Sequence, residues 1–164
     1  MNPVFRIGLG YDVHRLVPER PLILGGLTIP FHLGLLGHSD ADVLSHALGD
    51  ALLGAAGLGD LGRLFPDSDP QFKGISSLRL LETIHSLVQK QGYRIENVDL
   101  TVVAQEPKLA PYMHKMQTIL AEVLHLSGDQ INIKATTTEG LGFAGRQEGM
   151  AAYAVALLVK NNAG

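Results

Sequence analysis

The sequence contains no cysteine and no tryptophan. Without cysteine the chain has no disulfide, no thiolate nucleophile and no cysteine-ligated zinc, so histidine and carboxylate are the metal ligands that remain. The sequence also lacks a basic N-terminal stretch followed by an apolar core, and no apolar run approaches the roughly twenty residues that span a bilayer. We therefore expect a soluble, cytoplasmic protein that does not associate with a membrane.

Charge is scarce as well, since 18% of the 164 residues are charged and the formal net charge is -3. This mild acidity argues against a nucleic-acid partner, and a hydrophobic content of 46% argues against a disordered chain. An anionic substrate would have to be held by local charge. The length fits a single domain over residues 1–164, and the 19 glycines predict close approaches of the backbone.

Hydrophobic periodicity predicts an α+β fold, in which helices cover one face of a mixed β-sheet. Strand patterns occupy residues 4–12, 93–104, 131–136 and 150–160. Helical patterns occupy a segment capped by Ser39 or Asp40, then residues 76–91, and then residues 107–126, which open with a proline.

Two further segments are rich in turn formers. Residues 21–30 predict a peripheral β-hairpin, because the pair Gly25 and Gly26 allows the positive φ angles of a two-residue turn. Residues 57–74 predict a loop without regular structure, of the kind that often holds ligands.

Asp12, His14 and His46 form the first candidate site. Asp12 and His14 are two residues apart on a strand and therefore face the same side, while His46 lies on the first predicted helix. One oxygen and two nitrogen ligands leave a coordination position open, as a catalytic zinc requires. The alternative is a pair of hydrogen-bonded structural histidines, and spacing does not separate the two interpretations. Asp50, one turn beyond His46, is a candidate for orienting the zinc ligands.

Residues 134–146 form the second candidate site. Thr136, Thr137 and Thr138 place three hydroxyls at a strand end before a glycine-rich turn, where they can donate to phosphate, and Glu139 offers a carboxylate to a hard cation. The alternative is a threonine-rich strand end followed by a flexible loop. His38, just ahead of the first helix, can donate to an anion.

Two other features favour ordinary structural roles. The segment Gly-Leu-Gly-Asp-Leu-Gly at 57–62 matches the dinucleotide-binding fingerprint, but it follows a helix and enters a loop, which reverses the required context. A glycine cap at a helix C-terminus explains it better. The histidines at positions 32, 85, 114 and 125 have no carboxylate partner at useful spacing.

Short motifs run nearly from end to end in a characteristic order. They are Gly-Tyr-Asp-Val-His at 10–14, His-Ser-Asp-Ala-Asp-Val at 38–43, Asp-Ala-Leu-Leu-Gly-Ala at 50–55, Gly-Asp-Leu-Gly at 59–62, Phe-Pro-Asp-Ser-Asp-Pro at 65–70, Asn-Val-Asp at 97–99, Ala-Gln-Glu-Pro-Lys at 104–108 and Lys-Ala-Thr-Thr-Thr-Glu at 134–139. Together they resemble the 2-C-methyl-D-erythritol 2,4-cyclodiphosphate synthase family of the non-mevalonate isoprenoid pathway.

The resemblance implies roles for individual residues. Asp12, His14 and His46 match the zinc ligands of the family, with an oxygen of the substrate's β-phosphate in the fourth position. Glu139 matches the residue that holds a second divalent cation, Mg²⁺ or Mn²⁺, which bridges the substrate diphosphate. His38 and Thr137 match the catalytic positions that stabilise the transition state.

The resemblance also implies the substrate-binding residues. Those around the metal and the methylerythritol phosphate are Asp12, Val13, His14, His38, Ser39, Asp60, Leu61, Gly62, Phe65, Pro66, Asp67, Ser68 and Asp69. Those of the cytidine pocket are Ala104, Gln105, Glu106, Pro107, Lys108, Leu109 and Ala110. Those of the second site are Thr136, Thr137, Thr138, Glu139, Phe143 and Arg146. Arg146 and Glu148 also lie where the family lines a central channel.

Two residues depart from the commoner pattern of the family. Glu106 stands where a small residue is often found, and its charge would matter to the nucleotide only if it pointed toward the base. Gly140 replaces a longer side chain after Glu139 and is expected to loosen that turn.

The family's reaction is that of a phosphorus-oxygen lyase. It converts 4-diphosphocytidyl-2-C-methyl-D-erythritol 2-phosphate into the 2,4-cyclodiphosphate and CMP, when the substrate's own 2-phosphate attacks its β-phosphorus. Members are homotrimers whose sheets face the central axis and whose active sites lie between subunits, so a lone chain should hold half of each site. Two alternatives remain at this point: a metal-dependent phosphohydrolase using the same ligands, and a zinc-stabilised binding module closed by a fourth protein ligand.

Overall fold

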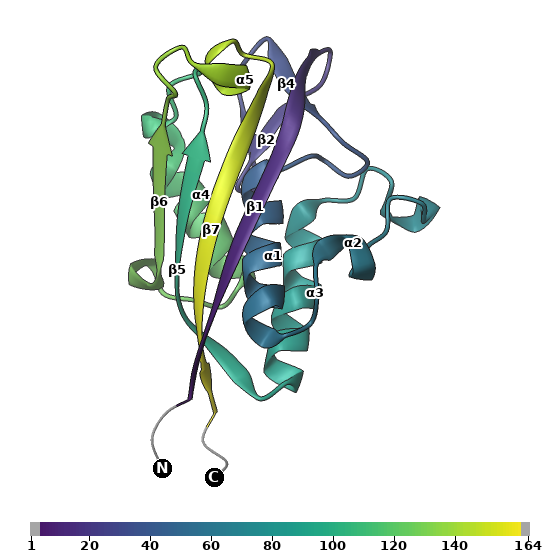
Figure 1. Ribbon diagram of the computed structural model, residues 1–164, viewed down its shortest axis with the longest axis vertical. Coiled ribbons are helices and arrows are strands. Elements are labelled where there is room, and N and C mark those ends of the chain that lie inside the picture. Colours follow the sequence, from purple (N-terminus) through teal and green to yellow (C-terminus); the bar gives the residue numbers. More distant parts are fainter. Residues whose placement is uncertain (1–3, 162–164) are drawn as a thin grey trace.

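The computed structural model describes residues 4–161, which are built around a five-stranded mixed sheet (Figure 1). Its strands are β1 (Phe5–Pro18), β4 (Leu33–Leu36), β5 (Tyr93–Val103), β6 (Ile131–Thr136) and β7 (Gly149–Lys160). They lie in the order β4-β1-β7-β5-β6, and only the β5–β6 pair is parallel. The predicted mixed sheet is therefore confirmed.

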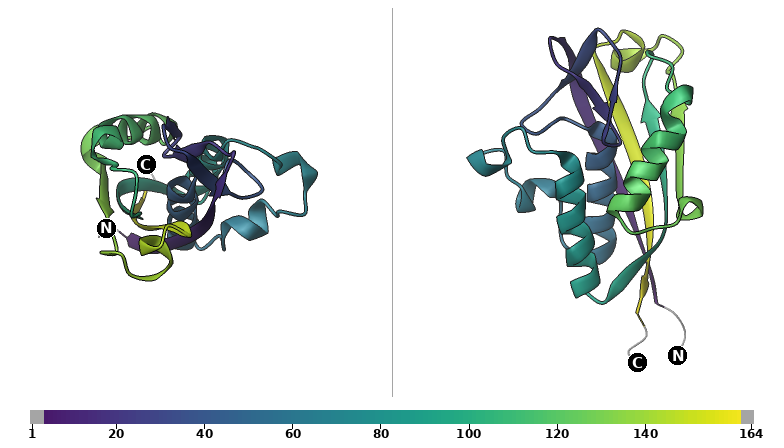
Figure 2. Two further views of the ribbon diagram at one scale, coloured as in Figure 1. Left: turned by 90° about the horizontal axis from the view of Figure 1, so that it is seen from above. Right: turned by 180° about the vertical axis from the view of Figure 1, so that it is seen from behind.

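Helices cover one face of this sheet, as predicted (Figure 2). They are α1 (Val43–Ala56), α3 (Ser77–Lys90) and α4 (Met113–Val123). Helix α1 packs directly on β1 and β7, and α3 packs on α1. Helix α4 lies in the crossover between the parallel strands β5 and β6, a connection that needs a dozen or more residues. None of the helices in residues 4–161 is long and apolar enough to cross a membrane.

Strand β1 alternates between the two faces of the sheet. Gly8 and Gly10 face α1, whereas Ile7 and Leu9, 76% and 69% exposed, belong to the uncovered face. A Cβ atom added at Gly10 would lie 1.8 Å from the carbonyl oxygen of Ala47, and one added at Gly8 would lie 2.0 Å from that of Ala51. The two glycines thus allow α1 to approach the strand closely, in line with the expectation from the glycine content.

The hairpin consists of β2 (Leu22–Leu24) and β3 (Leu27–Ile29). Its turn is confirmed, because Gly25 and Gly26 have φ angles of 54° and 74°. Its predicted peripheral position is wrong, since Leu22, Leu24 and Ile29 are buried in the main core. The hairpin is held there by the buried Asp42 carboxylate, which accepts hydrogen bonds from the backbone N–H groups of Gly25 (2.9 Å) and Gly26 (2.7 Å).

Several predicted boundaries are also corrected. The N-cap of α1 is Asp42, which accepts hydrogen bonds from the Ser45 backbone and hydroxyl, so neither Ser39 nor Asp40 caps this helix. Helix α4 begins at Met113 rather than at Pro107, because the 3-10 turn Ala110–Tyr112 precedes it. Strand β1 continues to Pro18 and pairs there with β4, a strand that the sequence did not predict.

Short helical segments interrupt the loops. The predicted loop at 57–74 contains α2 (Leu61–Leu64) and the 3-10 turn Pro70–Phe72. Their N-caps are Asp60, which accepts from the Arg63 backbone, and Asp69, which accepts from the Gln71 backbone. Another short helix, α5 (Gly142–Gly145), follows the second candidate site. Local capping therefore orders segments whose composition predicted irregular structure.

Replacing Asp42 with alanine is expected to destabilise the fold by about 3 kcal/mol, because two buried backbone N–H groups and one half-buried one would lose their acceptor at about 1–3 kcal/mol each. Urea unfolding measures this as a lower midpoint at constant slope. Asp129→Ala, which removes an exposed carboxylate, is the control. A loss below about 1 kcal/mol for Asp42→Ala would show that water or side chains replace the carboxylate.

Candidate metal centre and active-site cavity

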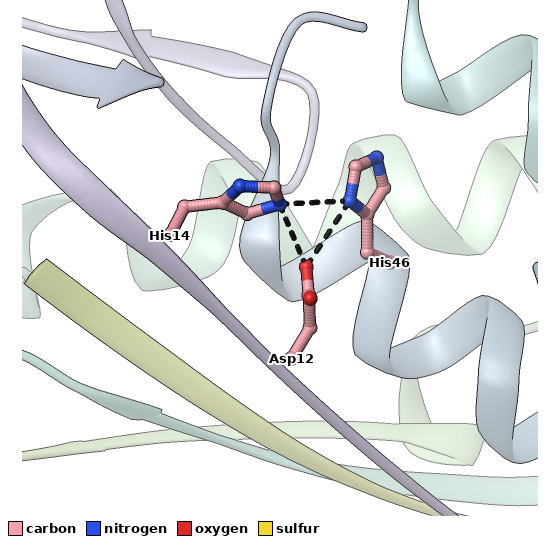
Figure 3. A group of neighbouring side chains, drawn as sticks. All are labelled: Asp12, His14 and His46. Carbon is pink, nitrogen blue, oxygen red and sulfur yellow. Dashed lines mark hydrogen bonds and ion pairs between the residues drawn. The ribbon is translucent and has the colours of Figure 1, made fainter. Parts of the chain in front are cut away.

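Asp12, His14 and His46 converge on one point between β1 and α1 (Figure 3). The Asp12 Oδ2 atom lies 2.9 Å from His14 Nε2 and 3.1 Å from His46 Nδ1, and these two nitrogens are 3.1 Å apart. The close approach of α1 to β1 at Gly10 brings His46 to the two ligands on the strand. The structure thus brings together the three residues that the sequence predicted as one site.

Hydrogen bonds behind the imidazoles set which nitrogen faces the site. His14 Nδ1 lies 2.9 Å from the backbone oxygen of Leu36 on β4. A carbonyl oxygen only accepts, so Nδ1 of His14 carries a hydrogen, and in the neutral ring the Nε2 lone pair points into the site. His46 Nε2 lies 3.1 Å from the Ser39 hydroxyl and 2.9 Å from the Ser77 hydroxyl, while its Nδ1 faces the site.

The arrangement fits a tetrahedral metal ion. Ligand bonds of 2.0–2.1 Å would place neighbouring donors about 3.3 Å apart, close to the separations of 2.9–3.1 Å between the three donor atoms. Within residues 4–161 no fourth histidine or carboxylate joins the group. The cluster therefore offers three ligands to a divalent metal and leaves a position open, which is the geometry of a catalytic rather than a structural site.

The electrostatics of the site favour a cation. Burial raises the pKa of Asp12, but hydrogen bonds and charge from His14 and His46 in their protonated forms outweigh burial and lower that pKa from 3.8 to about 2. Burial lowers the pKa of His46, but the hydrogen bond that its protonated ring donates to Asp12 and the charges of Asp12, Asp42 and Asp40 raise that pKa overall. The Asp12 carboxylate is therefore ionised at neutral pH, and the surrounding charge is negative.

A cavity of about 390 Å³ opens beside the three ligands. Its lining combines these ligands with His38, Ser39, Asp50, Leu61, Gly62, Phe65 and Asp67, together with Gly37, Phe72, Ile75 and Leu80. Many of the residues predicted to bind the methylerythritol phosphate thus border the metal centre. Asp60 and Asp69 act locally as helix caps, and the backbone oxygen of Asp69 lies 3.2 Å from His38 Nε2.

Asp50 has a different partner from the one expected. It lines the cavity, but its Oδ1 atom accepts a hydrogen bond from the Leu61 backbone N–H at 2.8 Å, and burial raises its pKa. Asp50 therefore anchors the start of α2. The contacts that orient the metal ligands in the described chain come instead from Leu36, Ser39 and Ser77. The Leu36 contact uses a backbone oxygen, and Ser77 is far from His46 in the sequence, so no sequence pattern predicts either contact.

A second cavity, of about 370 Å³, lies at the ends of β5 and β6. Its lining comprises Ala104, Gln105, Pro107, Lys108, Leu109 and Ala110, together with Ala135, Thr136 and Thr137. The predicted nucleotide segment and two of the three threonines therefore meet. Glu106 is exposed and outside this lining. The lining shares no residue with the cavity beside the metal ligands.

The turn after Thr138 has left-handed backbone angles. Glu139 and Gly140 have φ angles of 54° and 78°, and the Gly140 N–H donates to Gln105 Oε1 at 3.1 Å. Glycine suits such a backbone, so Gly140 adopts this turn without strain. Glu139 is not part of the metal group in this single chain.

Two other residues predicted to bind substrate occupy separate places. Phe143 borders a smaller cavity with Val13 and His14. Arg146 pairs with Glu148 at 3.1 Å. The single chain therefore does not gather all the predicted residues into one cavity.

Comparison with known proteins shows the family of the chain. The YgbB family model matches residues 5–159. A 2-C-methyl-D-erythritol 2,4-cyclodiphosphate synthase from Desulforamulus reducens is 61% identical over 153 residues, which are 93% of this chain and 98% of the relative.

Two solved structures also superpose closely on this chain. The bifunctional IspDF from Campylobacter jejuni superposes with a TM-score of 0.95 at 46% identity, over 98% of this chain and 44% of that longer chain. An IspF from Plasmodium falciparum, solved as a CDP complex, superposes with a TM-score of 0.86 at 34% identity, over 99% of this chain and 100% of that chain. The chain therefore belongs to the YgbB family, and it is similar to proteins named 2-C-methyl-D-erythritol 2,4-cyclodiphosphate synthase.

Proposed function

We propose that the chain is a 2-C-methyl-D-erythritol 2,4-cyclodiphosphate synthase, which converts 4-diphosphocytidyl-2-C-methyl-D-erythritol 2-phosphate into the cyclic diphosphate and CMP. The observation that carries the proposal is the open three-ligand group beside a cavity, in a chain 61% identical to a synthase of that name over almost its whole length. A relative solved with CDP supports a cytidine nucleotide as ligand.

Zinc is the proposed ion for Asp12, His14 and His46, because two imidazoles and one carboxylate suit it. When bound, it would polarise a phosphoryl group of the substrate and offset its charge. Glu139 is the proposed ligand of a second cation, Mg²⁺ or Mn²⁺, since a carboxylate oxygen suits both. An acidic chain could bind a polyanionic substrate in this way.

The side chains around the metal centre have the task of positioning. The attacking 2-phosphate is already anionic near neutral pH, so the reaction needs no strong general base. His38 and Thr137 are proposed to donate hydrogen bonds to the phosphates, and the cavity walls are proposed to hold the substrate bent. Such a near-attack geometry can lower the barrier by up to about 7–11 kcal/mol in an intramolecular reaction.

A homotrimer with the sheets facing its axis is the proposed assembly. In one chain the cavity of the metal ligands and the cavity of the nucleotide segment are separate. The uncovered sheet face carries exposed apolar side chains, among them Ile7, Leu9, Tyr11, Val13, Tyr153 and Val155. Apolar patches of this kind mark interaction surfaces. A neighbouring chain would cover this face and add its nucleotide cavity and Glu139 to the metal centre.

A product assay tests the proposed reaction. The cytidyl substrate should yield CMP and the cyclic diphosphate, without uptake of oxygen from labelled water, and chelation followed by dialysis should abolish turnover until zinc is restored. Native mass spectrometry should give three times the chain mass. A linear phosphate carrying solvent oxygen would show a phosphohydrolase instead, and chelator-resistant turnover would remove the metal from the reaction.

A further inference from the structure

A line of polar side chains runs away from the metal centre behind His46. The Ser77 hydroxyl lies 2.9 Å from His46 Nε2 and donates to Asp40 Oδ1. The Ser77 backbone N–H donates to the other oxygen of Asp40 at 2.9 Å. Ser77 is fully buried at the first turn of α3, and Asp40 lies in the loop before α1, so three separate segments meet here.

The number of hydrogens available fixes which atom donates in each of these hydrogen bonds. An ionised carboxylate only accepts, and a serine hydroxyl has a single hydrogen to give. Because Ser77 gives its hydrogen to Asp40, its oxygen must accept from His46, so Nε2 of His46 carries the ring hydrogen. The lone pair of the neutral imidazole is then on Nδ1, the atom that faces Asp12 and His14.

The Ser39 hydroxyl, which is also close to His46, does not select one tautomer of the imidazole. Ser39 Oγ lies 3.1 Å from His46 Nε2 and accepts from the Ala41 backbone N–H at 3.3 Å. The described contacts do not commit its hydrogen to an acceptor other than His46, so Ser39 can donate to Nε2 or accept from it. It therefore tolerates either tautomer of His46.

We propose that Asp40 and Ser77 are positioning residues that hold His46 in the tautomer able to bind a metal. In the competing tautomer Nδ1 would carry the hydrogen and donate it to Asp12 Oδ2, 3.1 Å away, which would remove one ligand and occupy another. Ser77 and Asp40 oppose that tautomer from behind. The proposal extends the metal site of the proposed function, and it concerns metal affinity rather than the reaction.

Zinc titration of the metal-free protein against a chromophoric chelator tests the proposal without substrate. Ser77→Ala is expected to weaken zinc binding by about 10- to 100-fold, as loss of a hydrogen bond behind a ligand typically does. The matched control is Ser76→Ala, one residue earlier, which loses the cap to the Leu78 backbone but does not touch His46. It should bind zinc within about twofold of the wild type. Equal zinc affinity for Ser77→Ala and the wild type would overturn the proposal.

Asp40→Asn supplies a second variant of nearly the same shape. If the two residues act through His46 as a unit, the double variant should bind zinc no more weakly than the weaker single variant, whereas independent structural effects would multiply. The cobalt-substituted single variants should also share an altered visible spectrum. Multiplying effects, or an unchanged spectrum in Ser77→Ala, would contradict the proposal. If the wild type binds zinc but forms no cyclic product, the proposed function fails while this test still applies.

Discussion

His46→Ala is expected to abolish cyclisation and zinc binding while the protein remains folded. The substitution removes one of three ligands, and Asp12 and His14 alone would hold the ion with two. Structural zinc sites bind with about 10–16 kcal/mol over four ligands, so one ligand accounts for roughly a hundred- to a thousandfold in affinity. The fold should survive because α1 packs on the sheet through its apolar face, and the His46 side chain is not part of that packing.

Metal analysis after dialysis, circular dichroism and the product assay measure the three parts of this result. His114→Ala is the matched control, since His114 is an exposed histidine on α4 outside the metal group. It should keep wild-type metal content and turnover. Full metal content in folded His46→Ala protein would refute the three-ligand site, and loss of turnover in that protein would then assign His46 to substrate binding.

Local rules placed the three candidate ligands on the strand and the helix, whereas their metal-binding role came from the family resemblance. Asp12 and His14 share a strand face through the period of two, and His46 sits at a helical position that the apolar pattern of α1 leaves polar. The spacing of residues does not predict how α1 packs against β1. That arrangement depends on Gly8 and Gly10, whose missing side chains carry no periodic signal.

Two incorrect predictions, the peripheral hairpin and the role of Asp50, concern contacts between residues far apart in the sequence. Asp42 ties a hairpin nearly twenty residues earlier to the start of α1, which turns a segment predicted as peripheral into part of the core. Ser77 meets His46 across 31 positions, and Leu36 orients His14 through its backbone. A backbone acceptor is available at every residue, so neither its use nor its partner can be read from the sequence.

Gly10→Ala is expected to destabilise the fold and to disturb the metal centre at the same time. The new Cβ would lie 1.8 Å from the Ala47 carbonyl oxygen and 2.8 Å from the Ala51 backbone nitrogen. Cβ atoms essentially never approach another heavy atom closer than 3.0 Å, so α1 and β1 would have to separate by more than about an ångström. Overpacking a core usually costs about 1–3 kcal/mol. Here we expect at least about 3 kcal/mol, because both neighbours are backbone and cannot turn aside.

The same separation should also weaken the metal centre, because it moves His46 away from Asp12 and His14. Gly54→Ala is the control within α1, since nothing lies within 4 Å of its added Cβ and alanine favours a helix interior by up to about 1 kcal/mol. Urea unfolding and zinc titration of both variants separate packing from helix propensity. If Gly10→Ala lost less than about 1 kcal/mol and kept its zinc affinity, the close approach would not be what holds the three ligands together.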